Sequence, residues 1–176
     1  PVPVHGYRAW WVTHRGLEGA TRFVWDGPRL TALCGRIDGI DDGEVPHTDG
    51  RCGHPPCGIY VLKEPGPMVR MAASSADDGG VVVGLTALTG KVVEHTEGYR
   101  AQHAEVTAAV VLQGDRVICG DSPNWVAHLF RSPAAAIAAA PALADDDPER
   151  YVTAIEYLAD RRRREEQRWT SESRSE

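Results

Sequence analysis

The chain has 176 residues, of which 42% are hydrophobic and 25% are charged. These fractions are typical of soluble globular proteins and exclude a chain that is disordered throughout, so we expect one domain of ordinary size with appendages. The formal net charge of -6 argues against a protein whose whole surface is built to bind nucleic acid or an anionic membrane.

The sequence carries no signal for membrane insertion or export. No apolar run approaches the roughly 18–20 residues that span a bilayer. The segment from Pro1 to His5 has neither the basic nor the apolar region of a signal peptide. Four cysteines are too few for a disulfide scaffold in a chain of this length. We therefore expect a cytoplasmic protein that contacts no membrane and whose thiols are reduced and available to a metal.

The regular structure predicted within residues 5–120 is mainly β-strand. Runs rich in aromatic and β-branched residues alternate with turn signals such as Asp26-Gly27-Pro28. Gly90 separates two regular runs and suits the curl of a strand in a small barrel. The alanines of 101–112 also suit a helix, whereas residues 108–112 are continuously apolar, as in a strand buried on both sides. The expected strands are 6–13, 21–25, 29–33, 58–62, 81–89, 91–95, 100–112 and 116–119.

After Ser132 the sequence changes to a helical pattern. Ser132-Pro133 begins one predicted helix over 134–140, and the aspartates before Pro148 are a strong start signal for a second. The predicted fold class is α+β. A compact, β-rich, barrel-like domain with a zinc-stapled loop occupies residues 1–130, two C-terminal helices form an appendage over 131–169, and residues 170–176 form a disordered tail.

The polar stretch from Leu33 to Tyr60 is the strongest candidate site. A loop of this length is an entropic burden on a small domain unless something ties it down. Zinc prefers four sulfur and nitrogen ligands, and a closed set of four is structural rather than catalytic. The predicted ligands of a structural Zn²⁺ are Cys34, His47, Cys52 and Cys57, with His54 as an alternative ligand.

Two other readings of the same residues are open. The cysteines can be small buried side chains at strand ends, with solvated histidines beside them. An iron–sulfur cluster is less favoured, because Cys119 would have to join it and the cysteine spacing would be irregular.

A second cluster of titratable residues surrounds a predicted turn. His103 and Glu105 share a face if residues 100–105 form a strand, and with His95 and Arg100 they could supply acid and base groups to one substrate. His103-Ala-Glu105 matches half of the zinc deaminase signature, but the downstream Pro-Cys-x-x-Cys half is missing and we reject that interpretation. The plainer interpretation is a charged hairpin end.

Two features could contact nucleic acid. Four consecutive arginines, Arg161 to Arg164, precede Arg168-Trp169, but neighbouring acids favour a solvated helix end. Trp10, Trp11 and Trp25 could form a stacking platform. Because adjacent residues of a strand point to opposite faces, we expect at least one of Trp10 and Trp11 to face a core.

Short motifs follow one another between residues 6 and 120: Gly6-Tyr-Arg-Ala-Trp10, Ala32-x-Cys34, His47, Cys57-Gly-Ile-Tyr60, Val92-Val-Glu-His95 and Glu97-Gly-Tyr-Arg-Ala101. In this order they resemble a family of small uncharacterised proteins of actinobacteria and actinobacteriophages. In that family two cysteines usually stand one residue apart just before Gly-Ile-Tyr. Here Pro56 precedes Cys57 and the other cysteine is Cys52, a departure that keeps His54 among the candidate ligands. The resemblance implies no activity and suits a cytoplasmic, phage-encoded protein.

These observations together predict a non-enzymatic, zinc-stabilised module whose partner is another protein, of host or phage. One alternative is a nucleic-acid-binding domain that uses exposed tryptophan and the arginine-rich helix. The other is an enzyme that acts through His95, His103 and Glu105. The C-terminal helix could also pair with that of a second copy to form a homodimer.

Overall fold

The computed structural model describes residues 2–34, 45–73, 79–114, 116–140, 142–144 and 150–173. Its strands are β1 (Val4–Thr13), β2 (Gly16–Glu18), β3 (Val24–Trp25), β4 (Arg29–Thr31), β5 (Ile59–Leu62), β6 (Val81–Glu94), β7 (Gly98–Gln113), β8 (Arg116–Gly120) and β9 (Ala142–Ala144). Its helices are α1 (Pro65–Ala73), α2 (Pro123–Arg131), α3 (Pro133–Ala139) and α4 (Arg150–Glu172).

The sheet is organised around the long hairpin of β6 and β7. One edge of β7 pairs with β6, and its other edge pairs in turn with β5, β4 and β8. The free edge of β6 pairs with β1 over residues 81–88, and β1 meets β5 at the single pair Tyr7–Leu62. The strands β1, β6, β7 and β5 therefore form a small ring that is barely closed between β5 and β1.

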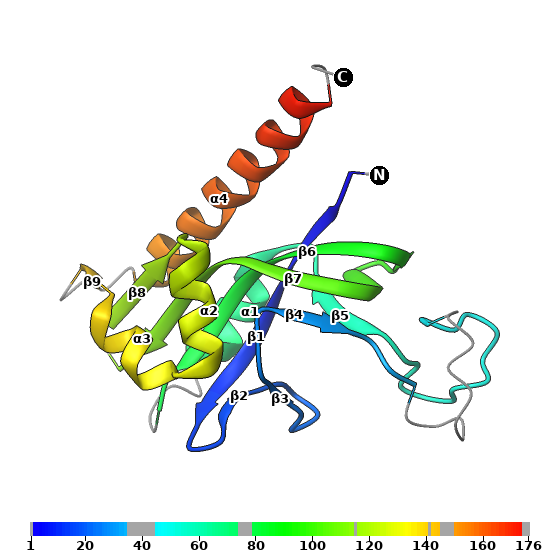
Figure 1. Cartoon of the computed structure of the whole chain (residues 1–176), viewed down its shortest axis with the longest axis horizontal. Helices are drawn as coiled ribbons and strands as arrows, with labels where there is room; N and C mark the ends of the chain where they lie inside the picture. Colours follow the sequence, from blue (N-terminus) through cyan, green and yellow to red (C-terminus); the bar gives the residue numbers. More distant parts are fainter. Residues whose placement is uncertain are drawn as a thin grey trace.

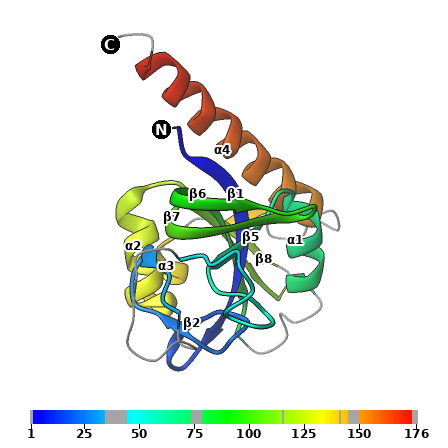
Figure 2. The same cartoon turned by 90° about the vertical axis from the view of Figure 1, so that its right-hand side faces the viewer.

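Helices cover both faces of this sheet, with α2 and α3 on one side and α1 and α4 on the other (Figure 2). Alternate residues of the central strands face the two helical layers. Val82 and Val111 pack in the core with α2 and α3, whereas Val83 and Val110 pack in the core with α1 and α4. This arrangement explains why residues 108–112 are continuously apolar, since both faces of the strand are buried.

Aromatic side chains fill the core below α2. The ring of Trp10 meets those of Trp25 and Phe130 edge to face at centroid distances of 5.1 and 5.3 Å. Trp10 packs so closely over Gly84 that a Cβ atom there would lie 2.8 Å from the indole. Trp11, its neighbour in β1, is 36% exposed on the opposite face.

The structure confirms the α+β class, the β-rich, partly closed ring of strands and the C-terminal helices. The helix considered for 101–112 is wrong, because this run lies within β7. Two helices were not predicted: α1 begins at Pro65, in a Pro-Gly-Pro stretch, and α2 begins at Pro123. In both, proline lies in the first turn, where its missing N–H is no loss.

The predicted helix over 134–140 corresponds to α3, and α4 follows it. The aspartates proposed to cap the second helix lie outside the described residues. Helix α4 continues to Glu172, so residues 170–172 of the expected tail are helical. Among the helices that the structure describes, none is long and apolar enough to cross a membrane.

Candidate metal centre

The four predicted ligands lie in the sequence between β4 and β5, and the described residues 45–58 of this segment extend from one end of the sheet (Figure 1). Thr31 at the end of β4 pairs with His103 of β7, and Ile59 at the start of β5 pairs with Ala101. The chain therefore leaves the sheet and returns to it at almost the same place on β7. This topology brings Cys34, just after β4, close to Cys57, just before β5.

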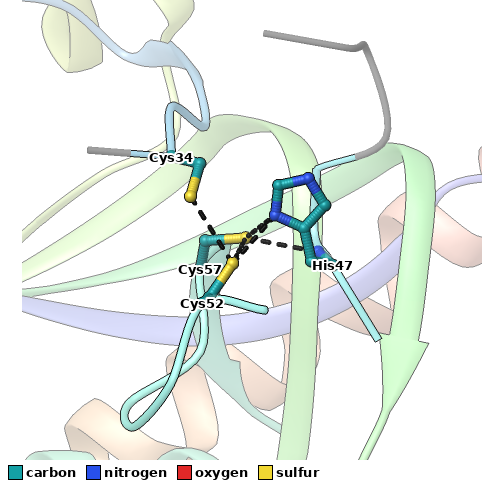
Figure 3. A group of neighbouring side chains, drawn as sticks. All are labelled: Cys34, His47, Cys52 and Cys57. Atoms are coloured by element: carbon teal, nitrogen blue, oxygen red, sulfur yellow. Dashed lines mark hydrogen bonds between the residues drawn. The ribbon is translucent and has the colours of Figure 1, made fainter. Parts of the chain in front are cut away.

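The side chains of Cys34, His47, Cys52 and Cys57 point toward one another (Figure 3). Their ligand atoms all lie within 4.8 Å of one another. The sulfur of Cys52 lies 3.4 Å from that of Cys34, 3.3 Å from that of Cys57 and 2.8 Å from Nδ1 of His47. His47 and Cys52 are buried, and Cys34 and Cys57 are half-buried.

The donor set and its spacing fit a tetrahedral metal ion. The sulfur–sulfur distances of 3.3 and 3.4 Å exclude a disulfide, whose bond is about 2 Å, and the four cysteines are free. Zn–S bonds of about 2.3 Å give a tetrahedron with sulfur–sulfur edges of about 3.8 Å. A small adjustment of the side chains would therefore suffice to place a cation among three sulfurs and one imidazole nitrogen.

Backbone contacts hold the ligands in place. The N–H of His47 donates to the sulfur of Cys57 at 3.2 Å. Gly58 follows Cys57 with φ +121°, a left-handed conformation that other residues adopt only under strain. A Cβ atom at Gly58 would lie 3.0 Å from the ring of Pro46 and 3.2 Å from Cβ of Arg100, so glycine also permits the close approach of the loop to β7.

Arg100 of β7 connects the ligands to the sheet. It is only 4% exposed, and its Nη1 donates to the carbonyl of Cys57 at 2.8 Å and to that of His47 at 3.3 Å. Its Nε donates to Nε2 of His95 at 2.8 Å. Sequence reasoning named Arg100 only as a catalytic candidate. Arg100 is a buried cation that binds the backbone carbonyls of two candidate ligands. It is therefore expected to support the metal centre.

The other two candidate ligands lie outside the cluster. His54 is exposed, and its side chain is not part of the group formed by the described ligands. Cys119 lies on β8 beside Tyr157 of α4, and burial raises the pKa of its thiol to about 11. A thiol that stays protonated is a poor metal ligand and a poor nucleophile.

The proposed acid–base residues do not form one site. His95 lies at the end of the β6–β7 hairpin, next to Arg100. His103 lies five strand positions beyond Gly98, roughly 16 Å along β7. There it bonds the Thr31 hydroxyl at 3.1 Å, and nearby Glu105 pairs with Arg29 at 2.9 Å. His103 and Glu105 do line one shallow hollow, but with β4 rather than with His95.

The four consecutive arginines lie in the middle of α4, not at a helix end, and they are paired with acids. Arg161 contacts Asp121 and Glu165, Arg162 contacts Glu166, and Arg168 contacts Glu165. Asp160 pairs with both of the other arginines in the run, Arg163 and Arg164. Trp10 and Trp25 are fully buried, so they offer no stacking surface. Charge neutralised within a helix is weak evidence for a phosphate-binding surface.

The chain matches no protein-family model, no curated protein and no solved structure.

Proposed function

We propose that the cluster of Cys34, His47, Cys52 and Cys57 holds a structural Zn²⁺, and that the chain is a non-enzymatic module that binds another protein. The observation that carries the metal assignment is the closed set of four sulfur and nitrogen ligands. Tetrahedral zinc is satisfied by such a set and keeps no position for water or substrate. The ion would link the two ends of a long polar loop and reduce its freedom.

Electrostatics support this assignment. Three thiolates and a divalent cation carry a net charge of about -1, which must be balanced where the surroundings exclude water. Arg100 supplies a buried positive charge beside the carbonyls of His47 and Cys57. The site would therefore be close to neutral when zinc is bound.

Exposed apolar side chains near the start of the metal-binding loop favour a protein partner. Leu33 is 73% exposed and Phe23 is 55% exposed. Both line a hollow of about 250 Å³ that also includes Gly58, next to the ligand Cys57. We call it the Leu33 hollow. Exposed apolar side chains around a concave surface are typical of protein interaction sites. The resemblance of the motifs to actinobacterial and phage proteins suggests a partner from a host or a phage.

Limited proteolysis tests the role of the metal. Arg51 lies in the loop immediately before Cys52, so trypsin cleavage after Arg51 reports the opening of the site. Chelation of zinc is expected to accelerate this cleavage by about tenfold or more, with cleavage after Arg22 in the β2–β3 turn as the internal control. Equal acceleration at both positions would indicate general unfolding, and no acceleration would exclude a zinc-ordered loop.

Affinity capture with quantitative mass spectrometry tests the partner surface. Native protein and the Val152→Asp variant, altered at an exposed apolar residue of α4, should retain the same partner. Leu33→Asp should lose it. If no captured protein depends on Leu33, the interaction surface is wrong. Salt-sensitive binding of DNA or RNA by the native protein would favour the nucleic-acid alternative instead.

A further inference from the structure

A second hollow is lined by residues of strands β1 and β5, of helix α1 and of the end of the β6–β7 hairpin. Its volume is about 260 Å³. The aromatic rings of Trp11, Tyr60 and Tyr99 and the thioethers of Met68 and Met71 line it, together with Arg8. Trp11 is 36% exposed, Tyr60 39% and Met71 50%. We call this the Trp11 hollow.

The hollow exists because the ring of strands is open here. After the single pair Tyr7–Leu62, β1 and β5 share no further ladder pair. The Arg8 side chain crosses the gap between them, and its Nη1 donates to the carbonyl of Tyr60 at 2.7 Å. Arg8 therefore stands in the wall between the Trp11 hollow and the Leu33 hollow, and it lines both.

The positive charge of Arg8 is balanced by no acidic side chain among the described residues. Its guanidinium lies 5.3 Å from the ring centroid of Trp25, and its Nε is buried without a hydrogen-bond partner among the described residues. No ion pair within the described ranges involves it. Burial lowers the pKa of Arg8 to about 10, which reflects the same desolvation of its charge. A half-buried guanidinium whose charge is balanced by no described acid favours an anionic ligand beside it.

We propose that the Trp11 hollow binds a small monoanion with a flat apolar body, of the class of an aromatic carboxylate. The carboxylate meets Arg8, and the ring lies among Trp11, Tyr60 and Tyr99. A phosphate dianion is a poorer match, because Arg8 is the one arginine or lysine that lines the hollow in the described structure and Glu97 also lines it. The volume is below the usual 300–1,000 Å³ of drug-sized sites, which limits the ligand to about a dozen non-hydrogen atoms.

The residues that carry this inference lie outside the metal cluster, and it requires no protein partner. A titration followed by NMR tests it with two probes of equal shape, naphthoate and its neutral amide, naphthamide. Naphthoate is expected to saturate the native protein with a dissociation constant of about a millimolar or below. Naphthamide should bind about tenfold more weakly or worse, since it carries no negative charge to pair with the Arg8 guanidinium.

Variants separate the charge from the apolar wall. Arg8→Gln should abolish the preference for naphthoate, and Arg8→Lys, which keeps the charge, should retain part of it. Trp11→Ala should weaken both probes, whereas Phe23→Ala, in the Leu33 hollow, should change neither. If Arg8→Gln does not fold, Arg8→Lys and the two probes on native protein still decide the question.

Two outcomes would overturn the proposal. Equal binding of the two probes would make the hollow an apolar anchor site for a peptide side chain, with no part for the Arg8 charge. Failure of naphthoate to saturate the native protein, or saturation unaffected by Trp11→Ala, would show that no such ligand site exists in this hollow.

Discussion

Replacing Arg100 by methionine tests the support that the sheet gives to the metal centre. Methionine has a similar length and can occupy the same buried space, but it donates no hydrogen bond. The carbonyls of Cys57 and His47 would lose the Arg100 donor, and His95 would lose the donor to its Nε2.

The expected loss of stability follows from these contacts. Each hydrogen bond from a charged group contributes about 1.5–3 kcal/mol, and a buried carbonyl left without a partner costs about 1–3 kcal/mol. The bond to His47 is long at 3.3 Å and should contribute least. We expect Arg100→Met to lower the free energy of unfolding by about 3–5 kcal/mol. For a chain of this size that is roughly a 10 °C fall in Tm.

Urea denaturation with zinc present is the assay. The midpoint should fall while the slope m stays constant, because the surface exposed on unfolding is unchanged. Arg29→Met is the matched control: this side chain is 78% exposed and pairs with the exposed Glu105, so its loss should cost at most about 1 kcal/mol. Arg100→Met within about 1 kcal/mol of Arg29→Met would refute the assigned role of Arg100.

Three further predictions concern the core, the pH dependence and the coupling between the loop and the Trp11 hollow. Trp10→Ala should lower the free energy of unfolding by about 3–5 kcal/mol in urea melts, whereas exposed Trp11→Ala should lower it far less. Burial lowers the pKa of His5, so the free energy of unfolding should fall as the pH drops below about 6.5, the pKa of histidine in the unfolded chain. In His5→Gln, urea melts across this pH range should show a smaller fall in stability. Chelation of zinc should weaken naphthoate binding in the NMR titration. The reason is that Tyr60, which lines the Trp11 hollow, donates its hydroxyl hydrogen bond to the carbonyl of Pro56 in the metal-binding loop. Unchanged affinity would show that the two sites are independent.

The metal centre was predictable because its signal is chemical. Three cysteines and a histidine in a polar loop between two strands are typical of a zinc site when the thiols are free. The choice between Cys52 and His54 could not be made from spacing, because the loop has no regular structure from which to place either side chain. The structure decides it by burying Cys52 and exposing His54.

Other features of the fold and of the two sites depend on contacts between segments that are distant in the sequence. The strand identity of 101–112 was ambiguous because alanine suits both a helix and a strand buried on two faces. Arg100 stands out in the sequence only as a charge at the start of a strand, and its partners lie 43 and 53 residues away. The Trp11 hollow is assembled from β1, β5, α1 and the hairpin end, so no local pattern could predict it. A charge in the middle of a mostly apolar strand, as at Arg8, was the one available hint.

The central claim is that four named side chains bind one zinc ion, and metal content tests it most directly. Elemental mass spectrometry of the purified native protein should find about one zinc per chain. Cys34→Ser and Cys57→Ser should lose it, and Cys119→Ser, outside the cluster, should keep it. Native protein without zinc, or cluster variants that retain it in full, would contradict the account.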